Sequence, residues 1–137
     1  MTEIKIYLET SNKSPKRRDG KVGYVLEKEG FEPLSGIAPA QNLTVNQAEM
    51  TALYKALFPI REPAELIIYT DSMYLANSVR CLEKWKTNGW LNAKGKEVAN
   101  RAAWELIDQK LQEHKVEFHV GDHHPYRKWL ETEVRRK

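Results

Sequence analysis

Three carboxylates stand at the ends or on the inner faces of predicted elements. Asp71 follows the apolar run Leu66–Tyr69, which is typical of a buried parallel strand, and Glu9 closes the alternating run Ile4–Leu8. Glu49 falls on the apolar side of a predicted helix, where a charge needs a partner. Carboxylates that converge without a basic partner repel one another, and divalent cations are the usual remedy. The pattern therefore indicates a divalent-cation site.

The order of the elements predicts that these carboxylates meet. Turn signals separate three predicted strands, Ile4–Glu9, Val22–Lys28 and Phe31–Ile37, which form an antiparallel meander. The third strand then runs in the direction of the first, so the helix after it begins at the carboxyl edge of the first strand. That helix feeds the strand Glu65–Thr70 parallel to the first, as in a right-handed crossover. The three carboxylates then share one edge.

The remaining elements are bounded by caps and prolines. Thr44 and Gln47 have the spacing of a capping box, and the helix they open runs to Phe58 before Pro59. Its inward stripe is predicted to be Ala52, Leu53 and Ala56, and Trp104 is predicted to lie in the core. Further elements are predicted as helices at Ser72–Cys81, Asn100–Leu111 and Tyr126–Arg136, and a strand at Val116–Val120. The chain is therefore predicted to be an α/β protein.

Each carboxylate also has a purely structural explanation. Asp71 or Ser72 can cap the helix that follows, and Glu49 can be an exposed side chain favoured by the dipole of the first helical turn. The convergence of all three is more specific than any one of them. If they repel one another, the replacement of Asp71 by Asn is expected to raise the stability of the metal-free protein.

Composition limits the class of protein. The 137 residues correspond to one domain, and 22 Lys and Arg against 19 Asp and Glu give a net charge of +3. Basic residues gather in Lys13–Lys21 and Arg80–Arg101, which indicates a polyanion partner. Cys81 is the only cysteine, so no disulfide partner is expected. No apolar run reaches membrane-spanning length, and we expect a cytoplasmic monomer without membrane contact.

The segment Glu83–Lys96, EKWKTNGWLNAKGK, interleaves basic and aromatic residues around two turns. This pattern suits contact with a phosphate backbone and its sugars. A tryptophan-stapled loop packed on the adjacent helix is the alternative, and we expect at least one tryptophan to serve only packing.

With these residues in view, the chain resembles a type 1 ribonuclease H over nearly its whole length. The matching pieces are IYLETS, NQAEMTAL, IYTDS, WKTNGW, GKEVANRAAW and a late His-Pro before the last helix. The resemblance implies one ribonuclease H-like domain over residues 1–137, with a five-stranded mixed sheet flanked by helices. It also implies an endonuclease that cuts the RNA strand of RNA/DNA hybrids with two Mg²⁺ ions and leaves 5′-phosphate ends.

Carried over by position, the resemblance assigns metal ligands. Glu49 and Asp71 match the glutamate and aspartate of the family, whereas Glu9 and Glu131 stand where aspartate is usual. Both changes keep the charge and the ligand atoms, so we interpret them as a retuned site. Since Mg²⁺ demands near-ideal octahedral ligands, Mn²⁺ is expected to support activity better. The mobile histidine of the family is assigned to His123, with His124 expected at the surface beside Pro125.

The resemblance also assigns substrate contacts. The basic segment at about residues 82–97 corresponds to the hybrid-gripping handle of the family. Asn46 matches a hybrid-contacting position suited to reading the 2′-OH. The full set of expected contacts is Thr10, Asn46, Ser72, Lys84, Trp85, Lys86, Trp90, Lys94 and Lys96.

Two other functions remain open from the sequence. One is a non-catalytic module that binds RNA/DNA hybrids or double-stranded RNA on the same fold. The other is a nuclease or strand-transferase of the same superfamily that acts on DNA, although such a protein is not expected to keep WKTNGW so completely.

Overall fold

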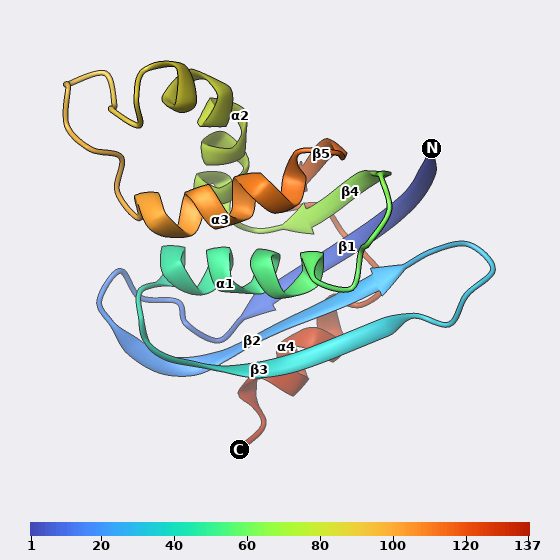
Figure 1. Ribbon diagram of the computed structural model, residues 1–137. Helices are drawn as coiled ribbons and strands as arrows, with labels where there is room; N and C mark the ends of the chain where they lie inside the picture. The colour runs from blue at the N-terminus through green and yellow to red at the C-terminus, as the bar shows by residue number, and fades with distance from the viewer.

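The computed structural model describes residues 1–137 and has nine regular elements (Figure 1). In chain order they are β1 Thr2–Thr10, β2 Arg18–Glu27, β3 Leu34–Leu43, α1 Val45–Leu57, β4 Ala64–Thr70, α2 Met73–Thr87, α3 Arg101–Leu111, β5 Lys115–Val120 and α4 Arg127–Arg135. No helix has both the length and the apolar character needed to cross a membrane.

The strands form one mixed sheet in the order β3-β2-β1-β4-β5. The pairs β1–β2 and β2–β3 are antiparallel, whereas β1–β4 and β4–β5 are parallel. The register of the parallel pair β1–β4 sets Tyr7 beside Tyr69. The chain then delivers Glu9 and Asp71 at the same edge of the sheet. The predicted α/β class, the meander and the parallel continuation are confirmed.

Helices cover both faces of the sheet. The main core lies between the sheet and α1, α2 and α3, with Ile6, Leu53 and Trp104 fully buried. A smaller cluster on the other face joins Tyr7 to Leu130 of α4. Figure 1 shows α1 and α3 across the near face of the sheet and α4 behind it. Successive residues of β1 therefore face different helices, as the pleat of a strand requires.

The predicted capping box of α1 is confirmed. The hydroxyl of Thr44 accepts a hydrogen bond from the Gln47 amide at 3.2 Å, and the Gln47 side chain accepts one from the Thr44 amide at 3.1 Å. The cap sets the rotation of the helix, so the inward stripe is buried as predicted. Its members are Glu49, Ala52, Leu53 and Ala56.

Several predicted boundaries are wrong, and the second strand begins at Arg18 instead of Val22. The third strand begins at Leu34 instead of Phe31, because Phe31 belongs to a turn in which its amide donates to the Lys28 carbonyl. The strand also continues past Pro39, since β3 is the edge of the sheet and an edge strand tolerates a missing N–H group. Helix α2 ends at Thr87 instead of Cys81. Its last turns pack on the core through Leu82 and Trp85. Because charged residues surround these two apolar positions in the sequence, the helical periodicity is weak there.

The hydroxyl of one half-buried tyrosine connects three helices. Tyr74 of α2 accepts hydrogen bonds from the indole N–H of Trp104 at 3.1 Å and from the Asn100 amide at 3.3 Å. Asn100 in turn accepts from the Gln47 side chain at 3.3 Å. The hydroxyl thus satisfies polar groups that lie against the core, where an unpaired donor is costly.

We predict that Tyr74→Phe lowers the free energy of unfolding by about 1–3 kcal/mol, because the Trp104 N–H loses its acceptor inside the core. Tyr54→Phe is the matched control, since the Tyr54 hydroxyl makes no hydrogen bond within the protein; it should change stability by less than about 0.5 kcal/mol. Urea denaturation of both variants measures the difference. Equal effects would contradict the structural role of the Tyr74 hydroxyl.

Candidate active site

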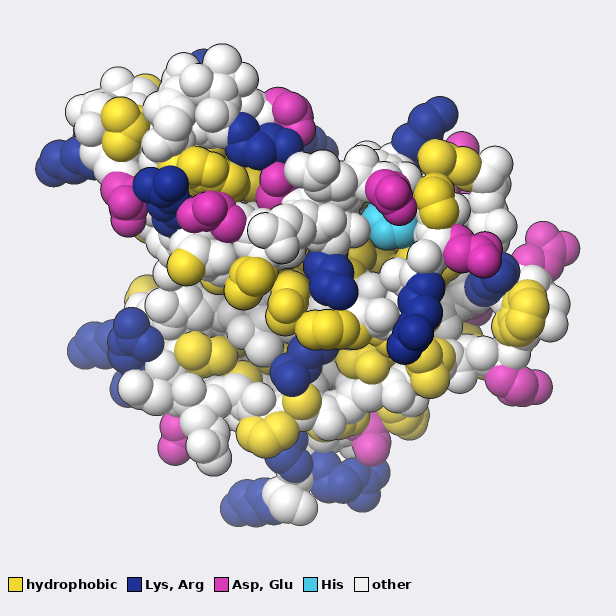
Figure 2. All heavy atoms as spheres, in the orientation of Figure 1, with side chains coloured by type: hydrophobic (Ala, Val, Ile, Leu, Met, Phe, Trp, Pro, Cys, Tyr) yellow, Lys and Arg dark blue, Asp and Glu magenta, His cyan; other side chains and the backbone are white.

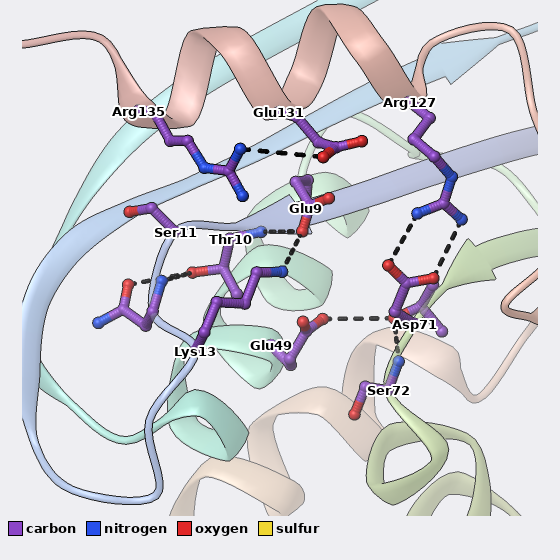
Figure 3. Close-up of polar contacts among 12 residues, drawn as sticks. Glu9, Thr10, Ser11, Lys13, Glu49, Asp71, Ser72, Arg127, Glu131 and Arg135 are labelled. Atoms are coloured by element: carbon purple, nitrogen blue, oxygen red, sulfur yellow. Dashed lines mark hydrogen bonds and ion pairs between the residues drawn. The ribbon is translucent and has the colours of Figure 1, made fainter.

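Four acidic side chains come from different elements to one edge of the sheet (Figure 3). Glu9 lies on β1, Glu49 on α1, Asp71 directly after β4, and Glu131 on α4. The first three belong to the parallel strands and their crossover helix, and Glu131 belongs to the helix on the opposite face. Figure 3 also shows Lys13 between Glu9 and Glu49, and Arg127 against Asp71.

Glu9 is buried, with 6% of its surface exposed, and is held by its own neighbours. Its Oε1 atom accepts from the Thr10 amide at 2.9 Å and from the Lys13 ammonium at 2.7 Å. The longer side chain therefore folds back toward the backbone that follows it. The ion pair with Lys13 neutralises a carboxylate that would otherwise be buried unpaired.

Glu49 is the most isolated of the four acids. It is 3% exposed, makes no salt bridge, and accepts one hydrogen bond, from the Thr70 hydroxyl at 3.3 Å. Burial, assisted by the negative charges of Glu9 and Asp71, raises the pKa of Glu49 to about 7, although the nearby Lys13 opposes the shift. The fold thus keeps a carboxylate in the interior without a full cationic partner.

Asp71 is bound by Arg127 in a bidentate pair. The two guanidinium N–H groups reach the two carboxylate oxygens at 2.8 and 3.0 Å. These hydrogen bonds hold the pKa of Asp71 below its ordinary value. The pair reverses the expectation for Asn at this position: the substitution should lower the stability of the metal-free protein, because it removes a charge-assisted pair.

The donor set suits divalent cations, which prefer carboxylate oxygens. As the side chains stand, no three Asp, Glu, His or Cys residues are grouped closely enough to hold an ion. Lys13 instead pairs with Glu9 and Arg127 pairs with Asp71, so these two cations neutralise part of the negative charge of the acidic edge. The Arg135 guanidinium lies 3.9 Å from the Glu131 carboxylate. Since Glu49 lacks an ion pair and is buried beside two other acids, the chemistry of this donor set fits a divalent cation, whereas the side-chain positions without an ion do not form one coordination group.

The histidines lie differently from the expectation. His123, the predicted active histidine, is exposed, whereas His124 is half-buried and not the surface residue that was predicted. The His124 ring lies 4.7 Å from the Tyr7 ring, centroid to centroid. Burial lowers the pKa of His124, and the charges of Asp71, Glu9 and Glu131 act on it in the opposite direction. His124 is thus the histidine whose pKa is affected by the carboxylates of the acidic edge.

Three expected substrate contacts near this edge have different surroundings. Thr10 is completely buried, and its hydroxyl is hydrogen-bonded to the Lys21 carbonyl at 2.9 Å, so it supports the strand instead of facing solvent. Ser72 caps α2 through the Leu75 amide at 3.0 Å. Asn46 is half-buried in the first turn of α1 and has no hydrogen-bond partner within the protein for its side-chain amide.

The predicted handle is part helix and part loop. Lys84, Trp85 and Lys86 lie in the last turns of α2, and Trp90, Lys94 and Lys96 follow in the loop. Figure 2 shows Lys and Arg side chains on the lobe that these segments form, with acidic side chains among them. The chain turns at Gly89 and Gly95, both at positive φ, which favours glycine.

The handle side chains divide into two groups. Lys84, Lys94 and Lys96 are exposed and make no ion pair. Lys86 instead contacts Asp108 at 3.1 Å and Glu83 at 2.7 Å. The two tryptophans, Trp85 and Trp90, are half-buried and pack against the main core. Packing therefore accounts for much of the surface of both.

Arg127 and Lys13 were not assigned to the site from the sequence. Lys13 was noticed only as part of a basic block, and Arg127 only as part of a helix. A signal for Arg127 exists, since it stands four residues before Glu131 and hence on the same face of α4.

The family model and the individual relatives that match this sequence all carry the description ribonuclease H. A sequence model of the family described as RNase H matches residues 1–126, a range that ends before Glu131. Ribonuclease H of Thermus thermophilus is 38% identical over 99 residues, which are 69% of this chain and 60% of that protein. Ribonuclease H of Actinobacillus pleuropneumoniae is 34% identical over 100 residues, 72% of this chain and 65% of that protein. The matched region spans less than two thirds of these relatives.

Comparison with solved structures supports the fold. The crystal structure of LC9-RNase H1, described as a type 1 RNase H with the type 2 active-site motif, has a TM-score of 0.73 and 16% identity over 98% of this chain and 71% of that one. The solution structure of the PFV RNase H domain has a TM-score of 0.68 and 23% identity over 97% of this chain and 88% of that one. At these identities the likeness is one of fold.

We predict that the contribution of Glu49 to the stability of the metal-free protein falls as pH rises from about 4.5 to about 7. The folded protein holds the Glu49 proton more tightly than the unfolded chain, in which the pKa of this carboxyl is near its ordinary value of 4.5, so the folded state binds more protons in this window. The stabilisation is complete below pH 4.5 and lost above pH 7, a change of about 3 kcal/mol.

Glu49→Gln should remove this pH dependence. Urea denaturation in EDTA, repeated at several pH values, gives the difference in stability between variant and parent. Groups common to both proteins, such as His124, cancel in that difference. A difference that stays constant across the window would contradict a buried carboxyl with a raised pKa.

Proposed function

The chain belongs to the RNase H family, and from this membership together with its acidic edge we propose that it hydrolyses the RNA strand of RNA/DNA hybrids. We propose two divalent cations as cofactors and 5′-phosphate ends on the products. We propose this activity for residues 1–137, on the basis of the fold, the handle and the four carboxylates of this chain.

The observation that carries the proposal is the burial of Glu49. This carboxylate lies beside Glu9 and Asp71 in the interior, makes no ion pair and has a single hydrogen bond. A protein gains nothing in stability from an uncompensated buried acid. A divalent cation held by these side chains would supply the missing charge, which would account for why the fold keeps Glu49 there.

Each acidic residue has a defined part in this proposal. Glu9, Glu49, Asp71 and Glu131 would hold the cations, which when bound supply activation of water and stabilisation of the departing 3′ oxygen. Glu131 would contribute from α4, on the opposite face of the sheet. His124 is neutral at physiological pH because its pKa is lowered. Its position beside the acidic edge favours it over His123 as the histidine that would assist departure of the product.

The substrate would lie between the acidic edge and the handle. Lys84, Lys94 and Lys96 are free to bind phosphates of the DNA strand. Asn46, whose amide has no partner within the protein, is suited to hydrogen-bond a 2′-OH group and so to select RNA.

Incubation of a labelled RNA/DNA hybrid with the protein in Mg²⁺ and then in Mn²⁺ tests the proposal. Single-stranded RNA, duplex DNA and duplex RNA are run beside it. Cleavage confined to the hybrid, and faster in Mn²⁺, is expected because Mn²⁺ binds such ligands more tightly and tolerates the lengthened Glu9 and Glu131. Tight hybrid binding without cleavage in either ion would favour the binding-module alternative.

We predict that Asp71→Asn lowers hybrid cleavage about a thousandfold or more, because a ligand charge is lost from the metal site. Hybrid binding should be retained or become tighter, since one negative charge near the phosphates disappears. Single-turnover cleavage and a binding titration measure the two effects. Asp122→Asn, the same change in the exposed loop nearby, is the control and should cleave at the parental rate. An Asp71→Asn variant that cut as fast as its control would remove Asp71 from the proposed ligands.

We predict different effects for the handle lysines. The triple change of Lys84, Lys94 and Lys96 to Ala should flatten the salt dependence of hybrid binding by about 0.7–0.9 log–log units for each phosphate that the variant no longer neutralises. Lys86→Ala should instead destabilise the fold, because buried Asp108 loses its cation. Binding titrations at several salt concentrations and thermal denaturation separate the two. An unchanged slope in the triple variant would mean that these lysines do not contact phosphates. The basic segment Lys13–Lys21 would then be the better candidate for that contact.

A further inference from the structure

Arg127 occupies a place at the acidic edge that the proposed mechanism does not use. It is the first residue of α4, and its guanidinium is directed at Asp71 (Figure 3). One terminal nitrogen lies 2.8 Å from Oδ2 of Asp71, and the other lies 3.0 Å from Oδ1. The second nitrogen also donates to the Asp122 carbonyl at 3.0 Å.

This pair engages both oxygens of Asp71 at once. A bidentate guanidinium–carboxylate pair is among the stronger interactions of side chains, and it neutralises the carboxylate. A divalent cation that binds Asp71 uses the same oxygens and is repelled by the guanidinium beside them. The two ligands of Asp71, guanidinium and metal, therefore exclude or weaken one another.

We propose that Arg127 competes with the divalent cation for Asp71, so that the cation binds only as the guanidinium withdraws. The inference rests on the proposed function to the extent that it takes Asp71 as a metal ligand. Arg127 then acts as a positioning residue that sets the cation concentration at which the site fills.

Arg127 is better suited to this part than Lys13, the other cation of the edge. Lys13 makes a single contact with Glu9, and its side chain is 47% exposed at the end of a flexible stem. The Arg127 side chain is 29% exposed and is anchored by the helix and by the Asp122 carbonyl. Because that second anchor does not involve Asp71, the withdrawn guanidinium stays tethered beside the site.

Competition has two measurable consequences. Removal of the guanidinium should tighten cation binding by about tenfold, the scale of one charge-assisted interaction. It should also destabilise the metal-free protein, in which the pair is formed, but not the metal-saturated protein, in which the pair is already broken. A purely structural salt bridge would destabilise both states equally.

Calorimetric titration of Mn²⁺ into the metal-free full chain, without nucleic acid, tests the first consequence. The proteins are the parent, Arg127→Ala, Arg127→Gln, and Arg136→Ala as a control that removes the same charge at the end of the same helix, where its partner is Glu133 and not a proposed ligand. We expect about tenfold tighter binding in both Arg127 variants and less than about twofold change in the control. Thermal denaturation in EDTA and in saturating Mn²⁺ tests the second consequence, and Arg127→Gln serves if the Ala variant folds poorly.

Equal or weaker Mn²⁺ binding in the Arg127 variants would overturn the competition, as would an equal loss of stability with and without Mn²⁺. The nuclease proposal can fail separately. Tighter Mn²⁺ binding in the variants, together with no hybrid cleavage by any of the proteins, would support the competition and overturn the nuclease.

Discussion

The structure depends on negative charge collected at the carboxyl edge of two parallel strands. Pairing of β1 with β4 brings Glu9 and Asp71 to that edge, and the crossover helix α1 adds Glu49 from one face of the sheet. Repulsion among these groups opposes folding unless cations intervene. The fold offsets it with Lys13 on Glu9 and Arg127 on Asp71, and leaves Glu49 with only the Thr70 hydroxyl.

The two faces of the sheet contribute differently to this edge. The face covered by α1, α2 and α3 holds most of the apolar core, and α1 presents Glu49 as part of its buried stripe. The other face is covered by α4, whose buried Leu130 and Val134 attach it to the sheet. That attachment places Arg127 and Glu131 over the acidic edge. The last helix thus stabilises the sheet and supplies charge of both signs to the site.

The handle is joined to the same framework by packing and ion-pair contacts. Trp85 packs against Trp104 with ring centroids 6.2 Å apart, and Lys86 pairs with buried Asp108. At the other end of the loop, Asn100 connects α3 to Gln47 in the first turn of α1. Residues that resemble substrate contacts in the sequence therefore fasten the handle, and the exposed lysines are left to face a phosphate backbone.

The sequence by itself determined the class of fold, the capping box at Thr44, and the order in which strands and helices bring three acids together. Those features follow from local periodicity and from the handedness of crossovers, which depend on neighbours in the chain. Only the tertiary structure decided the partners of the charges. Arg127 and Asp71 are far apart in sequence, and their pairing depends on how α4 docks on the sheet. The end of α2, the course of β3 and the burial of His124 were likewise decided by packing, because contacts with distant elements override the local pattern there.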